Sequence, residues 1–268
     1  SDPARHGSDP ADAFDVVVPS MPGYGFSDHT SEPGLDVLSI GDMWAKLMSE
    51  NLGYQRFGAQ GGDWGASVTA RLGFFHGAKV IGIHSTLPFR PTPYMGPGAK
   101  ELSKAEEDML QQRRDWQATE GGYAHIQGTK PQTLSYGLND SPAGLAAWIV
   151  EKYRTWSDCG GDVEKKFTKD ELLTTITIYW ATQSIGSSTK IYYETLRKPW
   201  NLEKDQRIDV PCGIAAFPAE ISVPLREWVE RSYNVQQWTV MPSGGHFAAL
   251  EEPDRLVDDV RDFFRPLR

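Results

Sequence analysis

The sequence has few cysteines, fewer basic than acidic residues and no long apolar run, and each of these shortages excludes a class of protein. Only two cysteines, Cys159 and Cys212, occur in 268 residues, so we expect no disulfide framework and a reducing, cytoplasmic compartment. Lysine and arginine total 27 against 36 acidic residues, and the net charge of −9 argues against a nucleic-acid or anionic-membrane partner. No run of about 18 apolar residues is present, and the first residues lack a signal-peptide pattern. We therefore expect no membrane-spanning or secretory segment.

Motifs that bind cofactors are lacking as well. Histidine, cysteine and carboxylate residues do not cluster at the spacings of metal ligands. The segment Gly58–Gly65 is rich in glycine, but it lacks the Gly-Lys-Ser/Thr ending of a phosphate-binding loop. The sequence therefore predicts no metal and no organic cofactor.

Short apolar runs alternate with segments of helical spacing over much of the chain. Apolar, often β-branched runs predict buried parallel strands at Phe14–Val18, Arg56–Gln60, Val80–His84, Cys212–Phe217 and Gln237–Met241. Helical spacing predicts helices at Ile40–Leu52, from Asp63 to Phe75, at Lys190–Arg197, at Leu225–Arg231 and from Pro253 onward. Gly53 is the predicted C-cap of the first of these helices. This alternation is typical of an α/β fold with a mostly parallel sheet flanked by helices.

The alternation stops between residues 88 and 187, where no convincing buried strand occurs. The helical patterns in this stretch lie at Lys100–Glu120, Pro142–Trp156 and Lys169–Ile185. Pro142 follows Ser141 at a favoured first helical position, and Thr168-Lys-Asp-Glu171 fits a capping box. We interpret residues 88–187 as a helical cap inserted into an α/β core that comprises residues 1–87 and 188–268.

The most informative stretch is Arg56–Arg71, in which a strand-like run ends at Gly61 and Gly62 and a helical run follows Asp63. Small residues must flank a side chain that stands on a sharp strand-to-helix turn, because bulkier neighbours would clash there. Such a turn presents its central side chain at the edge of the sheet. A carboxylate in this place can attack carbon without a base to deprotonate it. The alternative is that Asp63 is an ordinary helix N-cap.

Two further polar residues follow predicted strands in the same way as Asp63. Glu220 comes after the run that ends at Phe217, and His246 follows two glycines after the last strand. The carboxyl ends of parallel strands form one binding edge of a sheet, so we expect the three side chains to lie together. Their order along the chain is that of an α/β-hydrolase nucleophile, acid and histidine. Taken singly, Glu220 could be a first-turn carboxylate beside a helix dipole, and His246 could be a structural loop residue.

Several segments match, in order, those of one known family. They are Ser20-Met-Pro-Gly-Tyr-Gly-Phe-Ser27, Gly61-Gly-Asp-Trp-Gly65, Gly122-Tyr-Ala-His-Ile-Gln127 with Thr129-Lys-Pro131, Asn139-Asp-Ser-Pro-Ala-Gly-Leu-Ala-Ala147, Phe217-Pro-Ala-Glu220 and Gly244-Gly-His-Phe-Ala-Ala-Leu-Glu-Glu-Pro253. With these segments the chain resembles the epoxide hydrolases of the α/β-hydrolase fold, in the microsomal and juvenile-hormone branch with its soluble bacterial relatives. The resemblance extends over nearly the whole length.

The resemblance implies a role for each candidate residue. Asp63 is expected to be the nucleophile, His246 the general base and Glu220 the acid that orients it. Two cap tyrosines, Tyr123 and Tyr192, are expected to hydrogen-bond the epoxide oxygen and to donate a proton. Tyr193 competes with Tyr192, because neighbours on a helix point about 100° apart and only one can face the site.

The implied reaction turns an epoxide into a vicinal diol through a covalent ester on Asp63, with no metal or organic cofactor. Negative charge develops on an oxygen of that ester during hydrolysis, so backbone N–H donors are needed nearby. The backbone N–H of Trp64 follows the nucleophile and is the predicted donor.

The family also carries a His-Gly-x-Pro loop before the Ser-Met-Pro-Gly-Tyr-Gly segment, and this loop supplies part of the oxyanion hole. The present sequence has none. Its first strand-like run corresponds to an element well inside complete family members. We therefore expect the 268 residues to be a fragment of a longer protein, without the N-terminal strands of the sheet.

Other functions remain open at this point. A haloalkane dehalogenase shares the fold and the aspartate nucleophile, and it binds halide with the side-chain N–H of the tryptophan that follows. A non-catalytic binding protein of the same fold fits a truncated chain, whereas a serine esterase is disfavoured by Asp63. Four cap tryptophans, Trp116, Trp148, Trp156 and Trp180, suggest a bulky or aromatic epoxide as the small-molecule partner. A homodimer is the candidate assembly.

Overall fold

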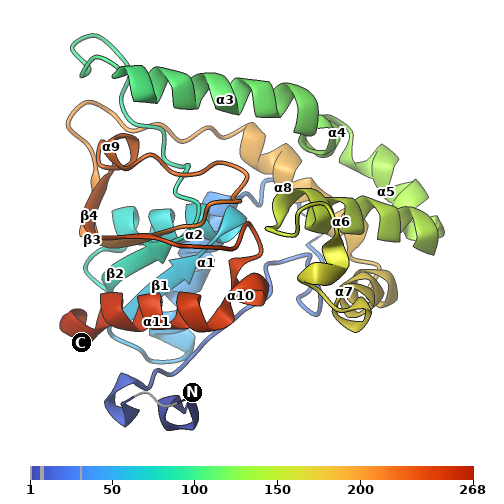
Figure 1. Cartoon of the computed structure of the whole chain (residues 1–268), viewed down its shortest axis with the longest axis horizontal. Helices are drawn as coiled ribbons and strands as arrows, with labels where there is room; N and C mark the ends of the chain where they lie inside the picture. The colour runs from blue at the N-terminus through green and yellow to red at the C-terminus, as the bar shows by residue number, and fades with distance from the viewer. Residues whose placement is uncertain (1, 7–8, 31) are drawn as a thin grey trace.

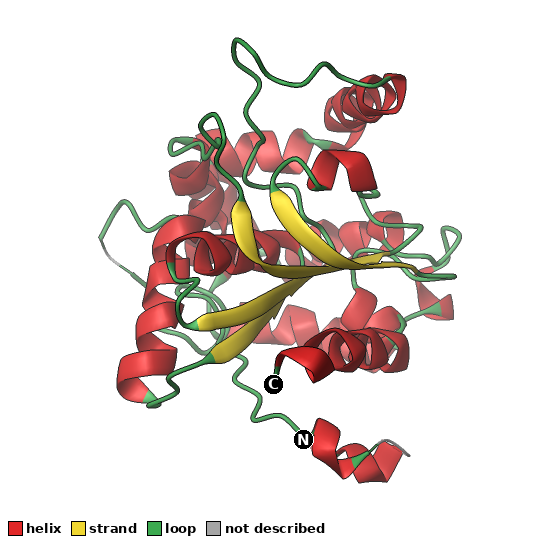
Figure 2. Ribbon diagram, turned by 90° about the vertical axis from the view of Figure 1, so that its left-hand side faces the viewer, coloured by secondary structure: helices red, strands yellow, loops and turns green. Residues whose placement is uncertain are grey.

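A parallel sheet of four strands forms the centre of the protein. The computed structural model describes residues 2–6, 9–30 and 32–268. The strands are β1 (Phe57–Gly61), β2 (Val80–Ser85), β3 (Ile208–Ala216) and β4 (Tyr233–Val240), and they lie side by side in chain order. Figure 2 shows helices on both sides of this twisted sheet. The sequence predicted the α/β fold class and these four strands, although β3 and β4 each begin four residues earlier than predicted.

Helices pack closely against both faces of the sheet. On one face lies α2 (Asp63–Phe75), where a Cβ at Gly73 would be 2.9 Å from Val210. On the other face, two phenylalanine rings of α11 (Pro253–Phe264) pack directly against glycines of the strands. A Cβ at Gly58 would lie 2.4 Å from Phe264, and one at Gly213 would lie 2.8 Å from Phe263. Glycine in these strands therefore sets how closely α11 packs.

The prediction of a buried strand at Phe14–Val18 is wrong. This segment is irregular and pairs with no strand, and its Val16 and Val18 are 63% and 84% exposed. The sheet ends at β1, and no strand among the described residues lies beside Phe14–Val18. An apolar run becomes a strand only where a neighbour satisfies its backbone N–H and C=O groups. Whether such a neighbouring strand is present depends on distant parts of the chain, so the local sequence could not show that Phe14–Val18 lacks one among the described residues.

The predicted helices of the core are present with shifted bounds. The first is α1 (Val37–Lys46), which continues as a π-helical turn to Asn51 before Gly53 adopts a φ of +78°. The others are α8 (Ile185–Leu196) and α9 (Arg226–Val229), and a short α10 (Ala248–Glu251) was not predicted. No helix in the described ranges is long and apolar enough to cross a bilayer.

Five helices occupy the stretch interpreted as a cap, and Figure 1 shows α3 above the sheet with the others grouped beside it. They are α3 (Lys104–Glu120), α4 (Gly122–Thr129), α5 (Pro131–Asp140), α6 (Pro142–Trp156) and α7 (Lys169–Ala181). Pro142 at the first position of α6 and the capping box at Thr168 are confirmed. Helices α4 and α5 were missed, because glycines inside both weaken the helical signal. The division into core and cap remains a prediction, and α8 runs across its boundary at residue 187.

A buried ion pair fixes α3 to the segment that follows α9. Arg231 donates through Nε and Nη2 to both carboxylate oxygens of Glu106, each at 2.5 Å. The Glu106 side chain is 0% exposed and the Arg231 side chain 8%. Arg231 also donates to the carbonyl oxygens of Lys100 and Glu101. The guanidinium holds the pKa of the Glu106 carboxyl below its usual range.

Replacing Arg231 by methionine should lower the free energy of unfolding by about 3–5 kcal/mol, since the Glu106 carboxylate would stay buried without its cation. The double variant E106M/R231M should lose less, because it leaves no buried charge. Urea unfolding followed by circular dichroism measures both variants. Equal losses in the single and double variants would show that the ion pair is not what holds α3.

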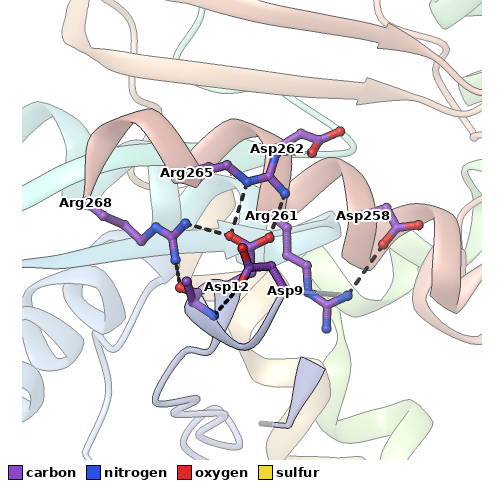
Figure 3. Close-up of polar contacts among 8 residues, drawn as sticks. Asp9, Asp12, Asp258, Arg261, Asp262, Arg265 and Arg268 are labelled. Carbon is purple, nitrogen blue, oxygen red and sulfur yellow. Dashed lines mark hydrogen bonds and ion pairs between the residues drawn. The ribbon is translucent and has the colours of Figure 1, made fainter. Parts of the chain in front are cut away.

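The N-terminal segment is held by side chains instead of strand pairing (Figure 3). Arg265 donates to the two carboxylate oxygens of buried Asp12 at 3.1 and 2.7 Å, and Arg268 donates to one of them at 2.6 Å. Arg268 also donates to the Ala11 carbonyl. The Phe14 ring packs edge-on against Phe264, with centroids 6.2 Å apart. Residues 11–14 are thus anchored to the C-terminal end of the chain.

Candidate active site

Asp63 stands on a strained turn between β1 and α2. Its φ is +46°, a left-handed value that is unfavourable for a residue with a Cβ. A Cβ at Gly61 would lie 2.3 Å from the Gly65 carbonyl oxygen, and one at Gly62 would lie 2.6 Å from Thr86 Oγ1. Only glycine fits at positions 61 and 62, so these two glycines allow the turn to form. The helix N-cap is Gly62 and not Asp63, so the N-cap interpretation of Asp63 is wrong.

His246 bridges the other two candidate residues. Its Nε2 lies 2.8 Å from Asp63 Oδ2, and its Nδ1 lies 2.6 Å from Glu220 Oε1. The side chains are 5% exposed for His246, 0% for Glu220 and 41% for Asp63. Glu220 lies in the turn after β3, and the next helix begins only at Arg226, so Glu220 is not a first-turn carboxylate. The sequence correctly predicted that the three residues meet.

The loop that carries His246 is bonded to the end of α6. The His246 backbone N–H donates to the Trp156 carbonyl oxygen at 2.8 Å. Glu251 accepts hydrogen bonds from the backbone N–H groups of Phe247 and Asp158, at 3.0 and 2.7 Å. The Asp158 carboxylate in turn accepts the Gly244 N–H at 3.0 Å. These bonds fix the histidine against the end of α6 as well as against Glu220.

His246 holds its proton more strongly than an ordinary histidine. Burial of the ring disfavours the charge, but hydrogen bonds and charge from Asp63 and Glu220 outweigh it and raise the pKa of His246 to about 10. At neutral pH His246 is therefore an imidazolium, hydrogen-bonded to Asp63 and Glu220. A reaction that turned Asp63 into an ester would remove one of these carboxylates, and the pKa of His246 would then fall.

The free energy of unfolding should depend on pH through His246. Its folded-state pKa of about 10 is higher than the value of about 6.5 for an unperturbed histidine. The contribution of His246 protonation to the free energy of unfolding is therefore complete below about pH 6.5 and is lost as the pH rises toward 10. The difference in unfolding free energy between the wild type and His246→Gln should shrink over this window. Urea titrations of both proteins across it provide the test, and a constant difference would argue against a raised pKa.

A cavity of about 220 Å³ lies between the triad and the cap helices. Asp63, His246, Tyr123 from α4 and Tyr192 from α8 all line it. The two tyrosine rings meet edge to face, with centroids 5.8 Å apart. Burial and the nearby charge of Asp63 raise the pKa of both phenols, so both hydroxyls keep their protons.

Tyr193 points away from this cavity. It lines a separate cavity of about 430 Å³. Its ring packs against the Arg197 guanidinium, whose central carbon (Cζ) lies 3.3 Å from the ring centroid. The rotation between helix neighbours thus separates Tyr193 from Tyr192, as expected.

Trp64 lies in the first turn of α2, where backbone N–H groups have no acceptor within the helix. The backbone N–H of Trp64 therefore has no hydrogen-bond acceptor within α2. Its role as the oxyanion donor remains a prediction. The indole packs against Tyr192, with centroids 4.9 Å apart, and its N–H is buried. The Trp64 side chain is not part of the cavity wall.

The cavity wall also contains residues that the sequence did not single out. Of the four cap tryptophans, Trp148 and Trp156 line it, whereas Trp116 and Trp180 do not. Gln127 and Lys152 are further polar residues in the wall. Gln127 lies four residues after Tyr123 and Lys152 four before Trp156, so helical spacing from a known site residue was the available signal. Among the described residues, no group of three or more His, Cys, Asp or Glu side chains is arranged to hold a metal.

The parallel sheet, the strained turn after β1 and the Asp63–His246–Glu220 arrangement define the α/β-hydrolase fold. No family model matches the sequence. A protein of Stigmatella aurantiaca, named as a candidate epoxide hydrolase, is 40% identical over 269 residues, which cover all of this chain and 60% of that protein. Epoxide hydrolase 1 of Sus scrofa is 38% identical over 98% of this chain and 62% of its own length.

A solved structure agrees with these sequence relatives. Juvenile hormone epoxide hydrolase of the silkworm Bombyx mori superposes with a TM-score of 0.79 at 30% identity, covering 93% of this chain and 63% of that protein. By sequence and structure, the chain is a homologue of the epoxide hydrolases of the microsomal and juvenile-hormone types. It spans 60% and 62% of the length of the two sequence relatives.

Proposed function

We propose that this chain carries the catalytic site of an epoxide hydrolase, which converts an epoxide to a vicinal diol through an ester on Asp63. The observation that supports this most directly is a carboxylate, bonded to His246, that shares one cavity with two protonated phenols. A carboxylate can displace oxygen at carbon, and phenols can donate to the oxygen that leaves. Homology to epoxide hydrolases supports the same reaction.

In the first step, a carboxylate oxygen of Asp63 attacks one epoxide carbon. The bond between that carbon and the ring oxygen breaks, and its electron pair moves to the oxygen. Tyr123 and Tyr192 donate hydrogen bonds to this oxygen, and one of them gives it a proton. The products are an ester on Asp63 with a neighbouring hydroxyl group, and one tyrosinate.

In the second step, His246 acts on water. Esterification neutralises Asp63, so the pKa of His246 falls and its proton passes through solvent to the tyrosinate, which leaves His246 as a neutral base. It then takes a proton from a water molecule that attacks the ester carbonyl, while Glu220 holds Nδ1. The N–H of Trp64 would stabilise the oxyanion. Collapse of that intermediate breaks the ester bond, passes its hydroxyl proton to the departing diol oxygen and restores the Asp63 carboxylate. The proton taken from water stays on His246, as at the start of the cycle.

The cavity favours a compact aromatic substrate. Its wall is largely aromatic, with Tyr24, Tyr179, Trp148, Trp156 and Phe247 among the lining residues. Its volume of about 220 Å³ is below the roughly 300–1,000 Å³ of most ligand pockets. We therefore propose an epoxide of the size of styrene oxide, which narrows the earlier expectation of a bulky or aromatic one.

The buried indole of Trp64 disfavours the haloalkane dehalogenase alternative. That reaction needs the indole N–H to face the leaving halide, whereas the Trp64 side chain lies outside the cavity wall. Two protonated phenols suit an oxygen leaving group better, because an alkoxide needs a proton and a halide does not.

A single turnover of styrene oxide in ¹⁸O-labelled water tests the proposal. With the full-length protein in excess, the first diol should be unlabelled and the label should appear in Asp63, because the new diol oxygen comes from the Asp63 carboxylate. Mass spectrometry of the diol and of the Asp63 peptide measures both. Labelled diol in the first turnover would exclude the ester. Chloride release from chloroalkanes without turnover of styrene oxide would favour the dehalogenase.

Removing the phenol hydroxyls should slow ring opening. Tyr123→Phe and Tyr192→Phe should each slow formation of the ester by about 10-fold to 100-fold, because the other phenol still donates. The double variant should lose about 10³-fold or more. Tyr193→Phe is the matched control and should leave the rate unchanged, since Tyr193 lies outside the cavity. Rapid-quench measurement of ester formation compares them, and equal effects at residues 192 and 193 would refute the assignment.

A further inference from the structure

Lys152 places a cation in the wall of the catalytic cavity. It lies on α6, and its Nζ is 4.8 Å from the centroid of the Tyr123 ring and 5.4 Å from that of Trp156. Its side chain is only 16% exposed. Glu151, half exposed, forms an ion pair with Nζ. Among the described residues that line the cavity, the other charged groups are Asp63 and His246.

The position of this cation matters because Tyr123 changes charge in the proposed reaction. A neutral phenol attracts an ammonium group through the face of its ring. When the phenol gives its proton to the epoxide oxygen, the ring becomes an anion and the attraction grows. An interaction that is stronger in the transition state than in the ground state accelerates the step. Burial and the charge of Asp63 act in the opposite direction, since both raise the pKa of Tyr123.

The contact distinguishes the two tyrosines. Lys152 stacks on Tyr123, whereas Tyr192 packs on Trp64 and meets Tyr123 edge-on. The carboxylate of Glu151 does not cancel the effect, because it is 50% exposed and screened by water, whereas the ammonium is largely desolvated.

We propose that Lys152 is a positioning residue for ring opening, which stabilises the charge that Tyr123 acquires as it protonates the epoxide oxygen. Tyr123 is then the proton donor, and Tyr192 donates a hydrogen bond only. The electron pair of the broken carbon–oxygen bond takes the Tyr123 proton, and the phenolate remains beside the Lys152 ammonium until solvent returns a proton. This inference rests on the proposed function.

The test separates the two chemical steps in single turnovers of styrene oxide by the full-length protein. Lys152→Met should slow formation of the Asp63 ester about tenfold, or about 1.4 kcal/mol in the barrier, and leave hydrolysis of the ester unchanged. Lys152→Arg should stay within about threefold of the wild type, because it keeps the cation. Lys152→Gln repeats the comparison with a polar side chain. Glu151→Gln is the control and should stay within about twofold.

A double-mutant cycle shows whether Lys152 acts through Tyr123. Adding Lys152→Met to Tyr123→Phe should slow ester formation no further, whereas adding it to Tyr192→Phe should give the full effect. A normal rate of ester formation in Lys152→Met and Lys152→Gln would overturn the inference, as would the same slowing in the Tyr123→Phe background or equal slowing of both steps. These outcomes leave the proposed function intact. Absence of any ester in the wild type would overturn both.

Discussion

A protein in which His246 is replaced by glutamine should accumulate an ester on Asp63 when it is mixed with an epoxide. Attack by Asp63 needs no base, so the first step continues. Hydrolysis needs a group that takes a proton from water, and glutamine cannot do this, so the second step should slow by about 10³-fold. Glutamine can still donate a hydrogen bond to Asp63, whose Oδ2 lies 2.8 Å from the imidazole in the wild type. The trapped protein should be heavier by the mass of one substrate.

Intact-mass spectrometry with several epoxides measures this adduct, and peptide mapping locates it. The double variant D63A/H246Q is the control and should remain unmodified. If His246→Gln gave no adduct while retaining its fold, or if the adduct lay on a residue other than Asp63, the ester mechanism would be refuted.

Replacing Asp63 by alanine should abolish diol formation, with a loss of about 10⁴-fold or more. The remaining site still holds Tyr123, Tyr192 and His246, but none of these groups supplies a nucleophile for the first step. Alanine would also keep a Cβ at a backbone φ of +46°, so Asp63→Gly is a useful companion that removes this strain. Both variants should be equally inactive in a diol assay.

The comparison of Asp63→Ala with Asp63→Gly separates chemistry from folding. Thermal unfolding should show that the glycine variant suffers less from the turn geometry, while neither makes diol. If either variant kept more than about 1% of wild-type turnover, direct attack by water would have to replace the nucleophile.

The strands and the triad could be predicted from the sequence because their signals are local. Glycines flank Asp63, and Glu220 and His246 each follow an apolar run that ends in a turn. A parallel sheet then brings such strand ends together by topology alone. Phe14–Val18 carried the same apolar signal and gave a wrong prediction, since pairing depends on a neighbour that no local pattern reveals.

Residues 88–187 were less predictable, because their contacts join segments far apart in the sequence. That Tyr192 and Tyr193 point in different directions follows from helical geometry, but their surroundings required the structure. Lys152 reaches Tyr123 only because side chains of α6 and α4 meet in the folded chain. Likewise, the bond between Glu251 and the Asp158 N–H spans 93 residues. No spacing rule connects such positions.

The bonds between the histidine loop and α6 constrain how this protein can move. His246 donates to the carbonyl of Trp156, and Gly244 and Glu251 hold Asp158 just beyond the end of that helix. An outward swing of α6 would have to break these bonds or pull the imidazole away from Asp63 and Glu220. A form opened at α6 would therefore be unable to hydrolyse the ester. If substrate enters by an outward movement of α6, that helix must return to its place before the ester can be hydrolysed.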